Sequence, residues 1–488
     1  MNEAQKQLIN KSNAELGPEE LERISHMVAG VKRFVDIICC FPDAREEYLR
    51  DDISFLNKNN INIDSEDIKF LWENQFSENR RILKNSPTLL DEIPESIFRY
   101  YQFLQNKFIA RDKMINELCA PDNAKMKKWR ERQIFRCNGD LGGVNRSFIH
   151  TIVTYELACG CSVGCEFCGL QAKKLTELFR NTPENMKLFR GVMKAMHDIL
   201  GDAAGYGMMY FATEPLDNPD YEDFEEAYLE EFDMIPQITT AVCDRDVARM
   251  KRLLAKLGTH KSFIHRFTLR SLDMAQNVFD KFTAEELLYV ELLPQYPESP
   301  VFVPYTVVGN EADRVKPENV RKDDPGTICC VDGFRINFCK KTLSVFTPCH
   351  MSSIHPRGIS EIATVTFTDA DDFRNKLLEM IDTYFVNDLP REYPLKLYDY
   401  FHIEHTDTGD RLISSHGGET LFLDKLPGTL YKNVIMILAE GKLTKREIAR
   451  KLNNETPENV FYVLNQLWKK GFIADPVFFP EIYENKEV

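Results

Sequence analysis

The sequence has 488 residues and a formal net charge of −15, with 43% hydrophobic and 28% charged residues. A chain of this length exceeds one ordinary core, so we expect about two to four domains of a soluble globular protein. The acidic balance argues against nucleic acid as the main partner, and no apolar run approaches the ~20 residues of a membrane span.

The N-terminal region, 1–145, is expected to be helical. Apolar residues recur at helical spacing in LERISHMVAGVKRFVDIICCF and in IPESIFRYYQFLQNKFIARDKMINEL. The first 20 residues are polar and carry no secretion signal, so the sequence predicts a cytoplasmic location without a membrane partner. No pattern in this region indicates chemistry, and its cysteines are expected to pack as small hydrophobic side chains.

Segment 146–310 alternates strand-like runs with helical ones. The expected strands are FIHTIVTYELA, GMMYFAT, PQITTAV, FIHRFTLRS and LLYVELLPQY. The expected helices between them are LQAKKLTELFR, DYEDFEEAYLEEF, RDVARMKRLLAKLG and MAQNVFDKF. This alternation predicts an α/β fold with a parallel sheet that is closed or partly closed into a barrel. Its chemistry is expected at the C-terminal ends of the strands.

Two further segments follow the alternating one. Segment 311–400 contains an expected hairpin, TICCVDGFRINFCKKTLSVFTPCHM, and an expected helix, FTDADDFRNKLLEMIDTYF. The tail, 401–488, shows two short strands, RLISSHGG and ETLFLD. Three helices follow them, over YKNVIMILAEG, TKREIARKL and PENVFYVLNQLWKKGFI. Thr444 and Glu447 have the spacing of a capping box, and the whole tail is typical of a winged-helix-like domain.

The cysteine loop, CSVGCEFC, places Cys161, Cys165 and Cys168 at C-x3-C-x2-C spacing directly after an expected strand. Thirteen cysteines in a chain that is expected to stay reduced favour metal or redox chemistry over disulfides. Three thiolates on one short loop can bind three irons of a [4Fe–4S] cubane and leave the fourth iron open. A zinc site is the alternative, but such sites usually show paired C-x2-C elements or histidines, and only Cys159 lies nearby as a fourth ligand.

At this loop the chain resembles the radical S-adenosylmethionine (SAM) superfamily. The resemblance covers about 149–300 and implies a partial (β/α)6 barrel with one [4Fe–4S] cluster on the three loop cysteines. It also implies that the open iron binds SAM, and that an external electron donor such as a flavodoxin or ferredoxin reduces the cluster. The expected product of SAM cleavage is a 5′-deoxyadenosyl radical.

The same resemblance assigns SAM-binding roles to four residues. It implies that Phe167, just before the last loop cysteine, lies near the adenine. It also implies that Glu214, in Ala-Thr-Glu-Pro, contacts the methionine amino group, although the glycines usual in this motif are absent. Arg270 is a candidate partner for the SAM carboxylate, and Ser271 for the ribose or carboxylate. For each of the four residues, the alternative is a solvated or capping side chain.

The second cysteine group, CCVDGFRINFCKKTLSVFTPCH, resembles the start of a SPASM domain. There, Cys330 and Cys349 occupy the places where an auxiliary iron–sulfur site begins. No cysteine follows Cys349, so we expect a degenerate SPASM-like region without a second cluster. A thiol is a good hydrogen-atom donor to a carbon radical, and we expect Cys349, or otherwise Cys330, to take this role. The alternative is a buried structural thiol in each case.

The tail resembles the PqqD-like domains that recognise leader peptides. In that family an extended leader adds a strand to the sheet edge beside the third helix, so the resemblance implies a ribosomal precursor peptide as partner. The alternative is a DNA-reading winged helix. It would need outward basic and amide side chains, whereas PENVFYVLNQLWKKGF is largely apolar.

Taken in this order, the whole chain resembles the radical SAM peptide epimerases that introduce D-residues into ribosomal peptides of the proteusin type. The resemblance implies removal of a Cα hydrogen from an L-residue by the deoxyadenosyl radical, and hydrogen return from a cysteine thiol on the opposite face. One alternative is a radical SAM enzyme that forms thioether or carbon–carbon crosslinks in a peptide. An alternative of another class is an iron–sulfur regulator that binds DNA.

Overall fold

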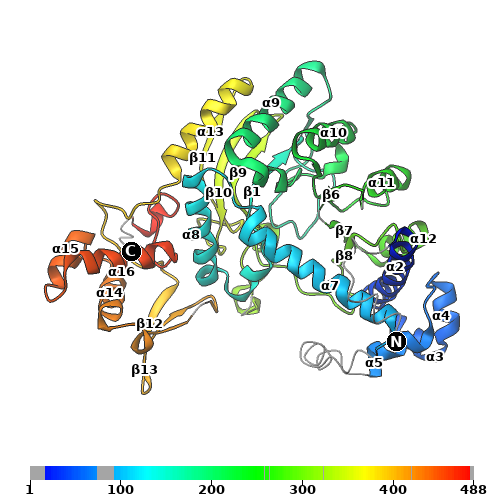
Figure 1. Ribbon diagram of the computed structural model, residues 1–488, viewed down its shortest axis with the longest axis horizontal. Helices are drawn as coiled ribbons and strands as arrows, with labels where there is room; N and C mark the ends of the chain where they lie inside the picture. Colours follow the sequence, from blue (N-terminus) through cyan, green and yellow to red (C-terminus); the bar gives the residue numbers. More distant parts are fainter. Residues whose placement is uncertain are drawn as a thin grey trace. The chain divides into compact units, whose positions relative to one another are not determined.

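The computed structural model describes residues 17–73 and 93–483, except 258, 263, 322, 323 and 419. The chain divides into two compact units (Figure 1). Unit 1 comprises Met1–Lys113 and Gln237–Pro304, and unit 2 comprises Met114–Pro236 and Tyr305–Val488. The domain limits expected from the sequence remain predictions.

Unit 1 begins with the helices that the apolar spacing predicts. They are α2 (Pro18–Cys40), α3 (Ala44–Arg50), α4 (Asp52–Lys58), α5 (Ser65–Glu73) and α7 (Glu95–Lys113). Helix α2 starts with Pro18 at its first position and has Glu19 and Glu20 in its first turn, both favourable at a helix N-terminus. Its buried face packs against α7. The expected helical character is confirmed for the described part of this region, and residues 74–92 lie outside it.

The second part of unit 1 is a small parallel sheet with its helices. The strands are β5 (Thr239–Thr240), β7 (His265–Leu269) and β8 (Val290–Pro294), which pair in that order, and the chain also contains the short β6 (Lys261–Ser262). The helices are α11 (Val247–Leu254) and α12 (Leu272–Lys281). These elements confirm the last three expected strands and the helices between them.

Unit 2 is built on a four-stranded sheet. Its order is β1 (Thr151–Glu156), β9 (Val331–Asn337), β10 (Thr342–Pro348) and β11 (Ile359–Thr366). Strand β1 pairs with β9 in parallel, and the other pairs are antiparallel, so the expected hairpin is confirmed as β9 and β10. Every residue of β1 is buried. A third strand of this region, β11, was not predicted.

Helices pack around this sheet. They are α8 (Ala124–Asp140), α9 (Pro183–Leu200), α10 (Tyr221–Phe232) and α13 (Ala370–Tyr384). Helix α9 packs against both α10 and α13, and α13 also contacts β10 (Figure 1). The short strand β4 (Met234–Ile235) follows α10. The expected helices over α10 and α13 are confirmed.

Two expected elements of this unit are wrong. The run LQAKKLTELFR was expected to be helical, but it returns antiparallel along the start of the cysteine loop as β3 (Glu177–Leu178), paired with β2 (Ala158–Cys159). Backbone pairing with β2 overrides the helical propensity of this run, and α9 begins only at Pro183, after the capping residue Thr182. The run GMMYFAT contains only an isolated bridge, Thr154↔Met208, rather than a strand.

The tail has three strands and three helices. Strands β12 (Phe401–Thr406), β13 (Gly409–Ser414) and β14 (Leu421–Phe422) form an antiparallel sheet in that order, of which β12 was not predicted. The helices are α14 (Thr429–Glu440), α15 (Lys445–Lys451) and α16 (Pro457–Lys469). The capping box of Thr444 and Glu447 is confirmed at α15.

These elements give a mixed α/β protein, as the sequence predicts, and its sheets are open. Closure of the strands into a partial barrel and a winged-helix arrangement of the tail remain predictions. Within the described ranges, no helix combines the length and apolar character needed to cross a membrane.

Candidate functional site

The cysteine loop joins β2 to β3 and is fixed at both ends. The Cys161 N–H donates to Lys173 O at 2.9 Å, and the Leu175 N–H donates back to Cys161 O at 3.1 Å. Within the loop, Gly164 has a φ of +64°, which favours glycine, and the Cys168 N–H donates to Cys165 O at 3.2 Å. All three loop cysteines are half-buried.

Backbone N–H groups point at two of these sulfur atoms. Val163 N lies 3.4 Å from Cys161 Sγ, and Ala172 N lies 3.4 Å from Cys168 Sγ. Hydrogen bonds of this kind stabilise thiolates and tune iron–sulfur clusters. Burial raises the pKa of Cys161, with a smaller contribution from the nearby Glu214 carboxylate, and the Val163 N–H opposes that rise.

The three loop sulfurs do not form a close group of donors of the kind that holds a single ion. In the part of the chain that the structure describes, two groups of three donors lie within 4.8 Å of one another, and neither group contains a loop cysteine. A single ion needs donors that close, whereas a cubane binds each thiolate through a different iron. The donor set therefore fits a [4Fe–4S] cluster better than zinc.

A second segment, 305–310, contacts the cysteine loop through hydrogen bonds and a ring stack. Asn310 N donates to Cys168 O at 3.1 Å, and Asn310 Nδ2 donates to Cys165 O at 3.3 Å. The Phe167 ring stacks on Tyr305, with ring centroids 4.4 Å apart and planes 13° apart. This segment belongs to a stretch, 296–326, that is rich in proline and charge. Gly309, with a φ of +60° beside Asn310, is the one local signal of a defined turn.

Glu214 lies beside the cysteine loop, at the start of a short 3-10 turn, Pro215–Asp217. Its side chain is buried, with 4% exposure, and its charge acts on Cys161. The same turn is bound to the loop through Asp217, which accepts hydrogen bonds from Ser162 N at 2.8 Å and Ser162 Oγ at 2.5 Å. The structure thus brings the predicted Glu214 together with the predicted cysteines.

Glu156, the last residue of β1, supports the segment before this turn. Its carboxylate accepts from Ala212 N at 2.9 Å and from Asn337 Nδ2 at 3.0 Å, and the side chain is buried. Sequence reasoning did not single out this residue. The sequence signal that could have identified it is its position: it is an acidic residue at the end of the strand that precedes the cysteine loop.

The two candidate hydrogen donors have different surroundings. Cys330 is half-buried and packs on the same hydrophobic cluster as Leu170, Tyr210 and Ala212, which flank the cysteine loop and Glu214 in the chain. Cys349 is 2% exposed, and burial raises its pKa well above the ordinary value. The structure therefore brings Cys330, rather than Cys349, next to segments of the predicted site.

Arg270 and Ser271 belong to unit 1. Ser271 Oγ accepts from Met274 N at 3.2 Å and caps α12, which matches the capping alternative for this residue. Arg270 is exposed, and its Nε donates to Ala241 O at 3.1 Å. Their roles toward SAM remain predictions.

The tail is bound to α8 within unit 2. Arg132 forms an ion pair with Asp475 at 2.7 Å, and its guanidinium lies 4.1 Å from the ring centroid of Trp468. Both charged side chains are buried. On the surface, the outer strand β14 exposes Phe422, and α16 exposes Tyr462.

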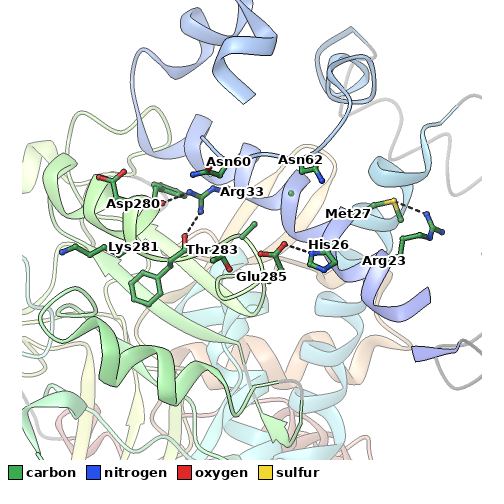
Figure 2. Close-up of a pocket in the computed structure, with 14 residues that line it drawn as sticks. Arg23, His26, Met27, Arg33, Asn60, Asn62, Asp280, Lys281, Thr283 and Glu285 are labelled. Atoms are coloured by element: carbon green, nitrogen blue, oxygen red, sulfur yellow. Dashed lines mark hydrogen bonds and ion pairs between the residues drawn. The ribbon is translucent and has the colours of Figure 1, made fainter. Parts of the chain in front are cut away.

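A cavity of unit 1 has a volume of about 610 Å³ (Figure 2). Its polar side chains are used within the protein. His26 and Glu285 point toward each other and pair at 2.7 Å, and Arg33 donates to Phe279 O at 2.6 Å and Phe282 O at 2.9 Å. These bonds connect α2 to the end of α12, so these side chains stabilise the packing of the two helices.

Comparisons with known proteins give two likenesses. No protein-family model matches the chain. The chain is 29% identical over 472 residues to an uncharacterized protein, y4wI, of Sinorhizobium fredii, and the match spans 94% of this chain and 88% of that protein. Among solved structures it is similar to BtrN in complex with AdoMet and 2-DOIA, at 14% identity and a TM-score of 0.31. That match covers 47% of this chain and 81% of BtrN, and at this TM-score it carries no argument here.

Proposed function

We propose that the chain is a radical SAM enzyme that holds one [4Fe–4S] cluster on Cys161, Cys165 and Cys168. The observation that carries the proposal is the cysteine loop itself. Its thiols are half-buried, and backbone N–H groups point at the sulfurs of Cys161 and Cys168, as in iron–sulfur sites. Bound there, the cluster supplies the electron that cleaves SAM to methionine and a 5′-deoxyadenosyl radical.

Side chains around the loop orient SAM in this proposal. Glu214 pairs with the amino group of the methionine moiety, since a buried carboxylate favours a cationic partner. Phe167, whose ring is held in place by Tyr305, lies near the adenine. Glu156 holds the segment before Glu214 through Ala212 N and thereby fixes the position of this carboxylate.

The proposed reaction is inversion of an L-residue in a ribosomally made precursor peptide. The deoxyadenosyl radical takes the Cα hydrogen and becomes 5′-deoxyadenosine, and the planar Cα radical then receives a hydrogen atom from a cysteine thiol on the opposite face. The surroundings of the two candidates favour Cys330 over Cys349 as this donor. The resulting thiyl radical regains its hydrogen as one electron from the external reductant and one proton from solvent.

The tail is proposed to hold the leader of the precursor peptide. An extended peptide pairs with an outer strand of the β12–β14 sheet through backbone hydrogen bonds, while exposed apolar groups such as Phe422 and Tyr462 contact its side chains. The tail lies in the same compact unit as the cysteine loop, which supports a shared role.

Incubation of the reduced enzyme with SAM and its precursor peptide in D2O tests this function. Inversion predicts one deuterium at Cα for each D-residue found after hydrolysis, with unchanged side chains. A loss of two hydrogens from the peptide would instead indicate crosslinking. Absence of 5′-deoxyadenosine would contradict a radical SAM enzyme altogether and would favour an iron–sulfur regulator.

A further inference from the structure

A second group of thiols lies beside the cysteine loop and takes no part in the proposed function. Cys159 Sγ, Cys339 Sγ and a carboxylate oxygen of Glu177 all lie within 4.8 Å of one another. The three residues are far apart in the chain, and separate elements bring them together: β2, β3 and the turn between β9 and β10.

The backbone fixes two of these donors on one face. Cys159 and Glu177 are direct partners in the antiparallel β2–β3 pair, so their side chains project to the same side. The pair is reinforced at Cys159 O, which accepts from Thr176 N at 2.9 Å and from Thr176 Oγ1 at 3.2 Å. The Cys159 sulfur and the Glu177 carboxylate therefore lie on the same face of the β2–β3 pair.

The third donor reaches this face because the β9–β10 turn is bound to β2. Asn337 Nδ2 donates to Ala158 O at 3.0 Å, and Asn337 Oδ1 accepts from Lys340 N at 3.0 Å, which closes the turn that carries Cys339. The Cys159 thiol points at the same turn, with its sulfur 3.5 Å from Asn337 Oδ1. The turn thus places the Cys339 sulfur close to the Cys159 sulfur.

We propose that Cys159, Cys339 and Glu177 bind a thiophilic divalent cation of the zinc class. Two thiolates and one carboxylate are a known type of donor set for tetrahedral zinc, with water in the fourth position. Sulfurs about 2.3 Å from one zinc stand about 3.8 Å apart, so donors within 4.8 Å need only small side-chain rotations. Cys159 is buried, Cys339 is half-buried and Glu177 is exposed, which leaves an open side for the ion to enter.

Burial raises the pKa of both the Cys159 and the Cys339 thiol, so a bound cation has to displace both thiol protons. Two thiolates and a carboxylate carry three negative charges when ionised, and zinc supplies two positive charges. The exposed Lys340, whose charge acts on Cys159, offsets the remaining one. The other close group of donors, Cys137, His150 and Asp332, differs because all three residues are buried, which leaves an ion no open side to enter. Arg136 donates to the Cys137 sulfur at 3.1 Å, and His150 pairs with Asp332.

A bound ion would fasten the cysteine loop to the central sheet. The β2–β3 ribbon begins and ends the loop, and the β9–β10 turn belongs to the four-stranded sheet. One of its proposed ligands, Cys159, lies two residues before Cys161. This inference does not depend on the identity of the peptide reaction.

Metal content of the full chain tests the proposal. The protein with its iron–sulfur cluster assembled is given Zn²⁺ alone, desalted, and analysed for zinc and iron. We expect about one zinc per chain in addition to the cluster iron. Cys339→Ser should abolish zinc retention without lowering iron, and Glu177→Gln should weaken zinc about 10-fold or more. Cys39→Ser, which removes a half-buried thiol of α2, is the matched control and should retain zinc.

A chain with Cys161, Cys165 and Cys168 all replaced by Ala separates this site from the loop thiols. With Co²⁺ it should still show thiolate-to-metal absorption in the near ultraviolet, and adding Cys339→Ser should remove that absorption. Unchanged zinc in Cys339→Ser would overturn the proposal. So would freshly purified protein that retains no zinc and has lost two hydrogens at Cys159 and Cys339, since the pair would then be a disulfide. If Cys339→Ser fails to fold, the zinc content of Glu177→Gln, a change at an exposed position, tests the proposal instead. Unchanged zinc binding in that variant would also overturn it.

Discussion

At the scale of single residues, Cys330 and Cys349 differ in what surrounds their sulfur atoms. Cys330 is half-buried on the cluster that includes Tyr210 and Ala212, whereas Cys349 is enclosed near Arg136 and Asp140. A hydrogen donor must reach the substrate radical, so Cys330→Ala should reduce D-residues to the no-enzyme background. It should leave 5′-deoxyadenosine formation intact. Mass spectrometry of hydrolysed peptide and chromatography of the nucleoside measure the two outcomes.

Cys349→Ala serves as the comparison. It should retain inversion and lower the free energy of unfolding by about 1 kcal/mol, because it removes a buried sulfur. The opposite pattern, with inversion lost in Cys349→Ala and kept in Cys330→Ala, would return the donor role to Cys349.

Asp332 should make the stability of unit 2 depend on pH. Burial opposes its charge, but His150 and Thr347 overcome that effect, so the pKa of Asp332 lies below its ordinary value. Asn145 Nδ2 donates to Asn138 Oδ1 at 2.7 Å, which leaves Asn145 Oδ1 to accept from His150 Nε2 at 2.8 Å. The imidazole therefore lies between an amide oxygen and the Asp332 carboxylate, a fully buried pair.

A carboxyl with a lowered folded pKa contributes stability above its unfolded pKa of about 3.9, and this stability is lost as the pH falls toward the folded value. Urea unfolding should therefore show a fall in stability below about pH 4. Asp332→Asn should cost about 3–5 kcal/mol at pH 7 and flatten this acid dependence, because His150 loses its buried partner. Asp407→Asn, in the exposed turn after β12, should change neither quantity. Equal unfolding free energies for the Asp332→Asn and parent proteins would contradict the role of the pair.

At the scale of elements, the segment around Gly309 positions the cysteine loop. A Cβ at Gly309 would lie 2.3 Å from Gly169 O and 2.7 Å from Cys168 O, and its φ is +60°. Gly309→Ala should therefore displace the loop and strongly reduce 5′-deoxyadenosine formation. Gly428 has a φ of +82°, and a Cβ there would meet no atom within 4 Å, so it provides the control for backbone strain alone.

Gly428→Ala should cost about 1–2 kcal/mol of stability and leave SAM cleavage unchanged. Thermal unfolding and nucleoside formation, measured on both variants, separate strain from loop displacement. If Gly309→Ala cleaves SAM as fast as Gly428→Ala, the segment does not position the loop.

Local signals explain which elements the sequence predicts correctly. Helix α15 has a capping box that is readable in the chain, and this helix was predicted. Helix α9 was not predicted, although Thr182 and Pro183 are start signals for it. The run that becomes β3 misled the prediction, because LQAKKLTELFR has helical propensity and its pairing with β2 is decided by tertiary contacts. Strands as short as β2 and β3 carry no periodic pattern.

The candidate site follows the same rule. The spacing of the loop cysteines and the position of Glu214 were local and predictable. The hydrogen bonds from Asn310 to the cysteine loop and from Ala212 N to Glu156 join segments that are distant in the chain. A single sequence does not reveal such contacts. The group of Cys159 and Cys339 was missed for this reason, since the two residues come together only through the β9–β10 turn.

At the scale of the whole molecule, Arg132 connects the tail to the rest of unit 2. Replacing it by Ala leaves Asp475 buried without its partner, which should cost about 3–5 kcal/mol. We expect weaker binding of a fluorescent leader peptide, with SAM cleavage in the absence of peptide retained. Anisotropy titration and nucleoside analysis measure the two effects.

Arg146→Ala, at an exposed position after α8, is the control and should bind leader peptide as the parent does. Equal leader affinity in Arg132→Ala, despite a lower free energy of unfolding, would show that docking of the tail on α8 is not needed for peptide recognition.

The parallel pairing of β1 with β9 joins residues that the ribosome makes at very different times. Thr151 pairs with Val331, so 180 residues (331 − 151) separate the two partners. At about 5–20 residues per second, β1 waits on the order of 10 to 40 s for β9. During this interval the loop after β1 lacks the sheet that later supports it. Iron–sulfur loading should therefore follow the synthesis of β9, and nascent chains stalled before Val331 should acquire no cluster.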